Sequence, residues 1–322
     1  MNLTLGTEAT AFGESARKAL EAAGGDELVQ EIERDPSRRQ GVIAPLLGSL
    51  GAWELDPRAD ADELEAAASL CRAVGHWAMP YPVGARLARP AGGAEGLLVV
   101  ADDHPAAAVA GLDLRWEAVT LEGRRGHVVA PVLLERPGRA SAFVADLDVA
   151  LGDPPAGIGE IVRARADAAL GLLLGCWTLL GMLDRALSLT RHHVLEREQF
   201  GQPLAAFQGV QFQLTDAEVE RAGTEALALY ALWSLATGQP GALADVLACR
   251  LAAVEAADVV FRVAHQLHGA TGFCDEATVS WVSRHSIPLR RLPHGPSGTQ
   301  VALERAVGRG GLAGPFAGEA GR

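Results

Sequence analysis

Residues 197–211 read REQFGQPLAAFQGVQ and mark a turn between two helical regions. Gly201 and Pro203 lie inside this segment, and both residue types end regular helices. Arg197 is therefore expected at the end of a helix, where its guanidinium group can reach a neighbouring molecule. A planar guanidinium can bind a pyrophosphate through two parallel hydrogen bonds, and Phe200 adds a flat apolar face. The alternative is that Arg197 only complements the dipole of the helix that ends there.

The region before this turn, residues 168–183, reads AALGLLLGCWTLLGML and is the longest uncharged apolar run of the chain. A bilayer span needs about 20 apolar residues, so this run predicts a deeply buried helix and no membrane span. After the turn, apolar residues recur in alternating steps of three and four: Val219, Ala222, Ala226, Leu229 and Trp233. This spacing predicts a seam between antiparallel helices of a bundle.

Three zones divide the chain, and we take them as its predicted domains. Residues 1–93 carry helical spacing of apolar residues. Residues 94–153 switch to short valine-rich runs typical of strands, at 97–100, 114–121, 128–134 and 142–147. Residues 154–322 return to long helices. We therefore expect a mainly α fold in which a small sheet or barrel separates an N-terminal helical domain from a C-terminal helical bundle.

Composition excludes several classes of protein. Of the 322 residues, 49% are hydrophobic and 21% charged, which is ordinary for a globular chain and too apolar for a disordered one. The formal charge of −12 argues against nucleic-acid binding, because contacts to phosphates need a basic surface. The four cysteines have no CxxC spacing, so we expect no metal site and a reducing compartment. No targeting segment is visible at the start of the chain, and we expect a cytoplasmic location.

A second informative stretch, residues 265–273, reads HQLHGATGF. Gly269 and Gly272 allow a tight turn whose amides can point at phosphate oxygens, although an ordinary helix C-cap would use the same glycines. Together, the Arg-x-Gln-Phe-Gly turn, the Phe-Gln-x-Val-Gln segment and the Gln-x-x-Gly-x-x-Gly-Phe turn resemble the acyl-CoA dehydrogenase family. Members of that family have a helical N-terminal domain, a middle β domain and a C-terminal four-helix bundle. The sequence is most similar to actinobacterial members that work as pairs of unlike subunits, several of them on sterol-derived CoA thioesters.

The resemblance implies FAD as cofactor and assigns residues to it. In the family, the arginine and phenylalanine of the first turn contact FAD held mainly by another subunit, which implies that role for Arg197, Gln199 and Phe200. The second turn carries adenine and phosphate contacts, which implies a similar role for Gln266 and Gly269. Near the C-terminus, two residues resemble the family's Gly-Thr pair beside the flavin: Gly298 and Thr299.

The catalytic base expected from the resemblance is missing at both of its usual places. Ser297 stands where many members have the glutamate that removes the α-proton, and a serine hydroxyl is no carboxylate base near neutral pH. Other members carry the base on the preceding long helix, at a position that corresponds to about Gly171. Asp167 lies one helical turn from Gly171 and is the nearby acid that could substitute. The alternative is that Asp167 lies near a helix N-terminus, where the helix dipole favours an acidic side chain.

The favoured function is a subunit of an FAD-dependent acyl-CoA dehydrogenase that forms the α,β double bond of a CoA thioester. A homologous partner subunit would supply the base, and an electron-transfer acceptor would reoxidise the flavin. Two alternatives stay open. One is a structural subunit that binds no flavin, and the other is a self-sufficient homo-oligomer that uses Asp167. The acyl group itself cannot be read from the sequence.

Overall fold

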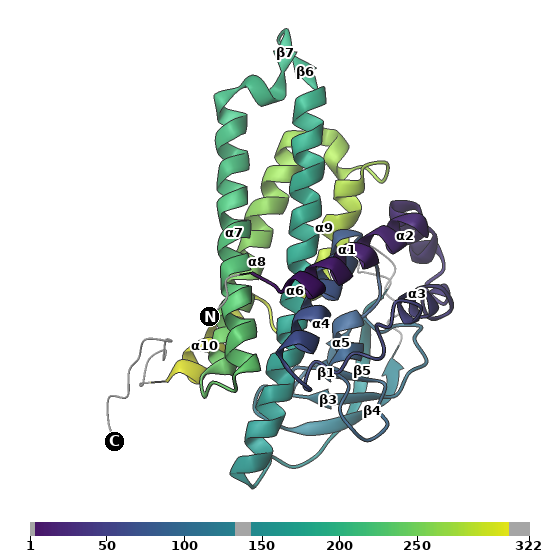
Figure 1. Ribbon diagram of the computed structural model, residues 1–322, viewed down its shortest axis with the longest axis vertical. Coiled ribbons are helices and arrows are strands. Elements are labelled where there is room, and N and C mark those ends of the chain that lie inside the picture. Colours follow the sequence, from purple (N-terminus) through teal and green to yellow (C-terminus); the bar gives the residue numbers. More distant parts are fainter. Residues whose placement is uncertain (1–3, 133–142, 309–322) are drawn as a thin grey trace.

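The computed structural model describes residues 4–132 and 143–308. An N-terminal helical region packs beside a tall helical bundle, and a small sheet lies below that region (Figure 1). This arrangement confirms the expected fold class, while the domain limits at residues 93 and 153 stay predictions. The N-terminal helices are α1 (Thr7–Ala22), α2 (Gly25–Arg34), α3 (Arg38–Gly48), α4 (Ala61–His76) and α5 (Val83–Leu87).

Helix α4 shows how the N-terminal region is built. Its first turn is capped by Asp60, whose side chain accepts a hydrogen bond from the Glu63 backbone N–H at 2.9 Å. Its other end packs against the long helix α6 (Ile158–Glu196) at glycines on both sides. A Cβ atom on Gly75 would collide with the Thr178 carbonyl, and one on Gly181 would collide with the Arg72 carbonyl. The two backbones can approach this closely only because neither position carries a side chain.

The small sheet lies within the zone expected to form strands. Its five strands have the order β1-β3-β4-β5-β2, with β1 parallel to β3 and the other pairs antiparallel. The predicted strand positions agree with β1, β3, β4 and β5, except that residues 133, 134 and 142 lie outside the described part of the chain. The bounds are β1 (Gly96–Val99), β2 (Ala106–Ala107), β3 (Trp116–Val119), β4 (Arg125–Val132) and β5 (Ala145–Leu151).

The C-terminal bundle is formed by α6, α7 (Gln208–Ala236), α8 (Ala242–His268) and α9 (Thr278–Arg291). Helix α6 is 39 residues long, which corresponds to about 58 Å. By length and composition it could cross a bilayer, yet 72% of its most apolar window is buried inside the structure, as predicted for a core helix. The smaller elements are β6 (Glu198–Gln199), β7 (Gln202–Pro203), η1 (Leu204–Ala206), η2 (Gly269–Phe273) and α10 (Pro296–Val307).

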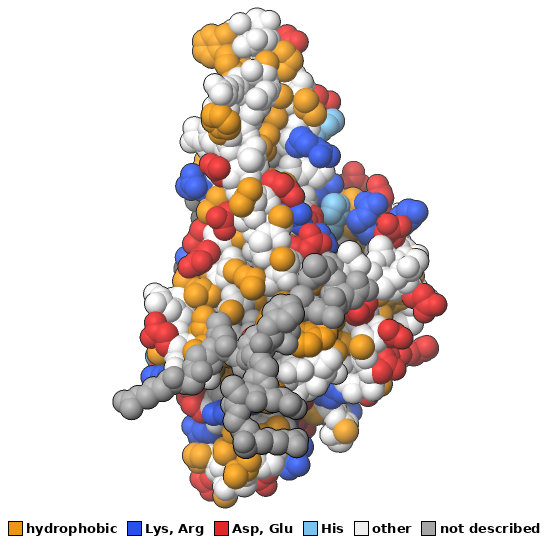
Figure 2. All heavy atoms as spheres, turned by 60° about the vertical axis from the view of Figure 1, so that its left-hand side comes forward, with side chains coloured by type: hydrophobic (Ala, Val, Ile, Leu, Met, Phe, Trp, Pro, Cys, Tyr) orange, Lys and Arg blue, Asp and Glu red, His pale blue; other side chains and the backbone are white. Residues whose placement is uncertain are grey.

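The predicted seam on α7 is real, but much of it faces outward. Val219 is 63% exposed, and Ala222 and Ala226 are also exposed. Helix α7 instead buries small residues against the bundle, such as Ala217 and Ala228. Hydrophobic side chains are therefore visible along this side of the molecule in Figure 2. The expectation that this seam packs within the chain was wrong for its first half.

Candidate functional site

The end of α6 and the turn that follows it form an exposed projection. The β6–β7 hairpin lies beyond the ends of the other bundle helices (Figure 1). The Arg197 N–H donates to the His193 carbonyl at 2.8 Å, and the Leu204 N–H donates to the Arg197 carbonyl at 2.8 Å. Gly201 has a φ of +82°, which suits the tight reversal of the chain at the tip. The hairpin is thus fixed to the helix end by backbone hydrogen bonds on both sides of Arg197.

The side chains of this hairpin are free to meet another molecule. Among the described residues, the guanidinium of Arg197 has no hydrogen-bond or ion-pair partner, and Gln199 is exposed. Phe200 is 92% exposed and has a φ of +55°, a strained value for a residue with a side chain. Its ring meets Phe207 edge-on, with centroids 6.1 Å apart, so an apolar face stays open. A large exposed aromatic beside a free cation is typical of a binding surface.

The second predicted turn lies beside the first. The rings of His193 on α6 and His268 on α8 stack with centroids 4.3 Å apart and an interplanar angle of 19°. Gln266 and Gly269 are exposed at this end of α8, and Gly269 has a φ of +62°. The structure therefore brings together Arg197, Gln199, Phe200, Gln266 and Gly269 at one end of the bundle. His193 was not singled out from the sequence, because nothing in its local spacing marks it.

Gly298 and Thr299 lie elsewhere, in the first turn of α10. Figure 1 places α10 at the end of the bundle opposite to the β6–β7 hairpin. Thr299 is buried, and its hydroxyl donates to the His294 carbonyl at 3.2 Å. The buried Arg250 also donates to the His294 carbonyl and to two carbonyls at the end of α9, those of Leu289 and Leu292. The predicted cofactor residues thus form two separate groups.

A mainly apolar cavity of about 180 Å³ lies between α6, the sheet and α9. Gly171 and Gly175 of α6 line it, and a Cβ atom on Gly171 would approach the Val99 side chain to 2.8 Å. The cavity is small, because drug-sized ligands occupy roughly 300–1,000 Å³. Its polar lining includes His285, whose ring nitrogens lie 3.0 Å from the Ala78 carbonyl and 3.0 Å from the Glu33 carboxylate. Neither His285 nor its acidic partner was singled out from sequence, because they lie 252 residues apart.

Asp167 does not line this cavity in the structure. Its carboxylate accepts hydrogen bonds from Arg58, at 2.7 Å, and from Arg125, and its side chain is only 13% exposed. It also lies beyond the first turn of α6, which begins at Ile158, so a helix-dipole role does not explain it either. Ser297 is exposed at the start of α10. Neither residue has a setting typical of a catalytic base.

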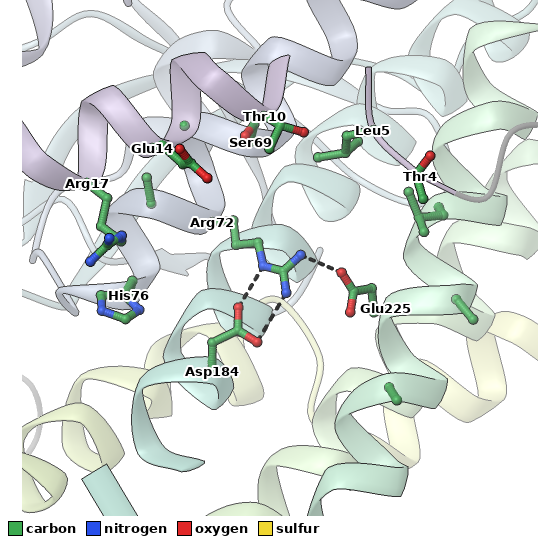
Figure 3. Close-up of a pocket in the computed structure, with 15 residues that line it drawn as sticks. Thr4, Leu5, Thr10, Glu14, Arg17, Ser69, Arg72, His76, Asp184 and Glu225 are labelled. Carbon is green, nitrogen blue, oxygen red and sulfur yellow. Dashed lines mark hydrogen bonds and ion pairs between the residues drawn. The ribbon is translucent and has the colours of Figure 1, made fainter. Parts of the chain in front are cut away.

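A second cavity, of about 690 Å³, opens between α1, α4, α6 and α7. Figure 3 shows Arg72 between two carboxylates, with Asp184 at 2.6 Å and Glu225 at 2.5 Å. Burial alone would raise the pKa of Glu225, but hydrogen bonds from Arg221 and Arg72 hold it below its ordinary value. On the wall of the same cavity, burial and the nearby Arg185 and Arg17 lower the pKa of His76 to about 4. The charged side chains at the centre of this cavity are paired with one another. They therefore connect the helices, and no unpaired charge among them is available to bind a ligand.

Comparisons with known proteins match the C-terminal part of the chain by sequence and the described residues by fold. Residues 171–304 match the family model "Acyl-CoA dehydrogenase, C-terminal domain". A probable acyl-CoA dehydrogenase, YngJ of Bacillus subtilis, is 29% identical over 178 residues, which are 55% of this chain and 44% of that protein. The acryloyl-CoA reductase (NADH) of Anaerotignum propionicum is 34% identical over 94 residues, 29% of this chain and 24% of that protein. The chain therefore matches less than half the length of either relative.

Similar solved structures extend the match to the whole fold. A variant of the Tcur3481–Tcur3483 steroid acyl-CoA dehydrogenase has a TM-score of 0.74 at 21% identity, covering 95% of this chain and 99% of that chain. The ChsE4–ChsE5 complex of Mycobacterium tuberculosis has a TM-score of 0.72 at 18% identity, with the same coverage. At this identity the likeness concerns the fold alone. Residues 171–304 therefore carry an acyl-CoA dehydrogenase C-terminal domain, and the described residues have the fold of the acyl-CoA dehydrogenase structures.

Proposed function

We propose that the chain is one subunit of a heteromeric, FAD-dependent acyl-CoA dehydrogenase and that it completes the cofactor site of a homologous partner. The observation that carries the proposal is the exposed end of the bundle, where the free Arg197 guanidinium and the open Phe200 face lie beside Gln266 and Gly269. A cation, a flat apolar ring and the exposed side-chain amides of Gln199 and Gln266 match the chemical parts of a dinucleotide, while the Gly269 N–H caps α8 by donating to the Gln266 carbonyl. FAD bound there would accept the hydride of the dehydrogenation, with its flavin seated mainly in the partner.

The partner would also supply the base. The two positions at which the family places this group hold Gly171 and Ser297. The Asp167 carboxylate is already paired with two arginines. Two of the similar structures carry the names of paired proteins, which supports a heteromer. One of them is a steroid enzyme by name, so we include sterol-derived groups among the proposed CoA thioester substrates. An electron-transferring flavoprotein also shares the fold, with a TM-score of 0.69, and a protein of that class is the proposed electron acceptor.

The test is to purify the chain together with a homologous subunit and to compare flavin content and dehydrogenase activity between variants. Arg197→Ala should weaken FAD binding by about 1.5–3 kcal/mol, the range for a hydrogen bond to a charged group, which is roughly 10- to 150-fold in affinity. Arg191→Ala is the matched control, because Arg191 is an exposed arginine on the same helix, about two turns before the hairpin. A wild-type complex without FAD would refute the proposal.

A structural subunit that touches no flavin is the second candidate, and the small volume of the apolar cavity beside Gly171 favours it. Under this reading, Arg197→Ala leaves the flavin content and the activity of the complex unchanged. A self-sufficient homo-oligomer remains the third, and it requires the chain purified alone to oxidise CoA thioesters with an artificial acceptor. The cytoplasmic location belongs to the same proposal.

A further inference from the structure

Two histidines connect the two turns that form the exposed end of the bundle. His193 lies in the last turn of α6, and its carbonyl accepts the N–H of Arg197 at 2.8 Å. His268 is the last residue of α8 and directly precedes Gly269. Because their rings stack at 4.3 Å, each ring fixes the position of the other helix end. The stack therefore links the Arg197 turn to the Gly269 turn, beside the packing of α6 on α8.

The tautomer of His268 is defined by its surroundings. Its Nδ1 lies 2.8 Å from the Ala264 carbonyl, which can only accept, so Nδ1 carries the proton. A third histidine extends the arrangement: His265 Nδ1 donates to the Gly272 carbonyl at 2.9 Å, and its Nε2 lies 3.0 Å from the Ser283 hydroxyl. The His265 ring also stacks on Phe273 at 4.4 Å. The second turn is thus held in place from α8 and α9.

The charges around the stack disfavour protonation. Burial lowers the pKa of His193, and His268 and Arg197 lower it further, while Glu196 opposes them. Burial also lowers the pKa of His268, although the hydrogen bond to the Ala264 carbonyl acts in the opposite direction. Burial lowers the pKa of His265 too, and His268 adds to this effect. These are the charged and titratable groups that act on the stack from α6 and α8. Two imidazolium rings at this separation would repel each other and the nearby guanidinium.

We propose that His193 and His268 are positioning residues that hold the two cofactor-contacting turns in register, and that they do so only while both rings are neutral. This inference rests on the proposed function, because the register matters for a cofactor that touches both turns. Acid would separate the rings, move Arg197 away from Gln266 and release the shared cofactor. Substituting both rings by phenylalanine keeps the stack and removes its titration.

The test uses the wild-type complex, the double variant His193→Phe with His268→Phe, and the single variant His193→Ala. Flavin retained after gel filtration should fall about fivefold for the wild-type complex between about pH 7.5 and about pH 5.5, and less than about twofold for the double variant. His193→Ala should lose flavin at every pH. His192→Gln is the control, since His192 is an exposed neighbour paired with Glu196 and should keep the wild-type profile.

Hydrogen exchange of residues 193–204 in the same complexes gives a second readout that needs no flavin. After correction for the intrinsic pH dependence of amide exchange, the protection of these residues should fall with acid in the wild-type protein and stay constant in the double variant. If the complex holds FAD but the double variant follows the wild-type pH profile, the positioning role is wrong. If the complex holds no FAD at any pH, the proposed function fails instead, and the exchange measurement alone decides whether the stack fixes the hairpin.

Discussion

His76 is a residue whose protonation should affect folding. Its pKa is lowered to about 4 in the folded chain, against an ordinary value of 6.5, so the unfolded chain binds its proton first as the pH falls. The stability that the neutral ring contributes is present above about pH 6.5 and is lost as the pH falls toward 4. Between about pH 7 and pH 5 the loss should reach at most about 2 kcal/mol. Urea unfolding at both pH values checks this, and His76→Gln should reduce the difference.

For single residues, the sequence indicated which side chains could bind or react, but not which residues surround them in the fold. The Arg197 turn was recognisable because a helix-ending Gly201 and Pro203 follow it within the chain. Asp167 was a candidate base because its spacing to Gly171 is visible, but the two arginines that bind it come from other zones of the sequence. His193 carried no signal, because its partner lies 75 residues away. Contacts that depend on the tertiary structure cannot be derived from local spacing.

The contact between helices α4 and α6 leads to a prediction at the level of elements. Gly181→Ala should destabilise the protein by about 1–3 kcal/mol, because the added Cβ would collide with the Arg72 carbonyl, and backbone moves less easily than a side chain. Gly223→Ala is the matched control on the exposed face of α7, where an added Cβ meets no atom within 4 Å. It should stabilise the helix by about 0.5–1 kcal/mol. Thermal unfolding of the two variants, with opposite shifts expected, measures both effects.

The seam on α7 shows what periodicity can and cannot predict. Steps of three and four correctly located a long helix with an apolar stripe. The same steps fit a stripe that faces the bundle and one that faces another protein, so the spacing could not assign Val219 and Ala226 to the surface. The strand positions were predictable for a different reason, because short valine-rich runs are separated by turns. The strand order β1-β3-β4-β5-β2 was not predictable in this way, because it pairs strands that are not consecutive in the chain.

At the scale of the whole molecule, Asp167 joins three regions of the chain. Arg58 precedes α4, Arg125 begins β4, and Asp167 lies on α6, so the ion pairs connect the N-terminal region, the sheet and the bundle. Asp167→Asn should reduce the free energy of unfolding by about 1–3 kcal/mol, because charged hydrogen bonds are lost while both arginines stay partly exposed. Asp216→Asn, at an exposed site on α7, should change it by less than about 0.5 kcal/mol.

The same pair of variants separates a structural from a chemical role. If Asp167→Asn abolishes turnover of the assembled enzyme while its melting temperature stays unchanged, the self-sufficient alternative regains support. If Asp167→Asn lowers the melting temperature and the rate per folded complex stays constant, Asp167 has a structural role. Melting curves and steady-state rates on the same preparations decide between these outcomes.

The length of α6 has a consequence for how many reaction centres this polypeptide can serve. Gly171 lines the inner cavity, whereas the hairpin begins where the helix ends, about 38 Å further along a continuous rod. One extended flavin dinucleotide does not cover that separation. Under the proposed function, a single protomer would therefore take part in two different centres of the assembled enzyme, lining one near Gly171 and contacting the cofactor of the other through the hairpin. Substitutions near Gly171 and substitutions in the hairpin should then impair different centres.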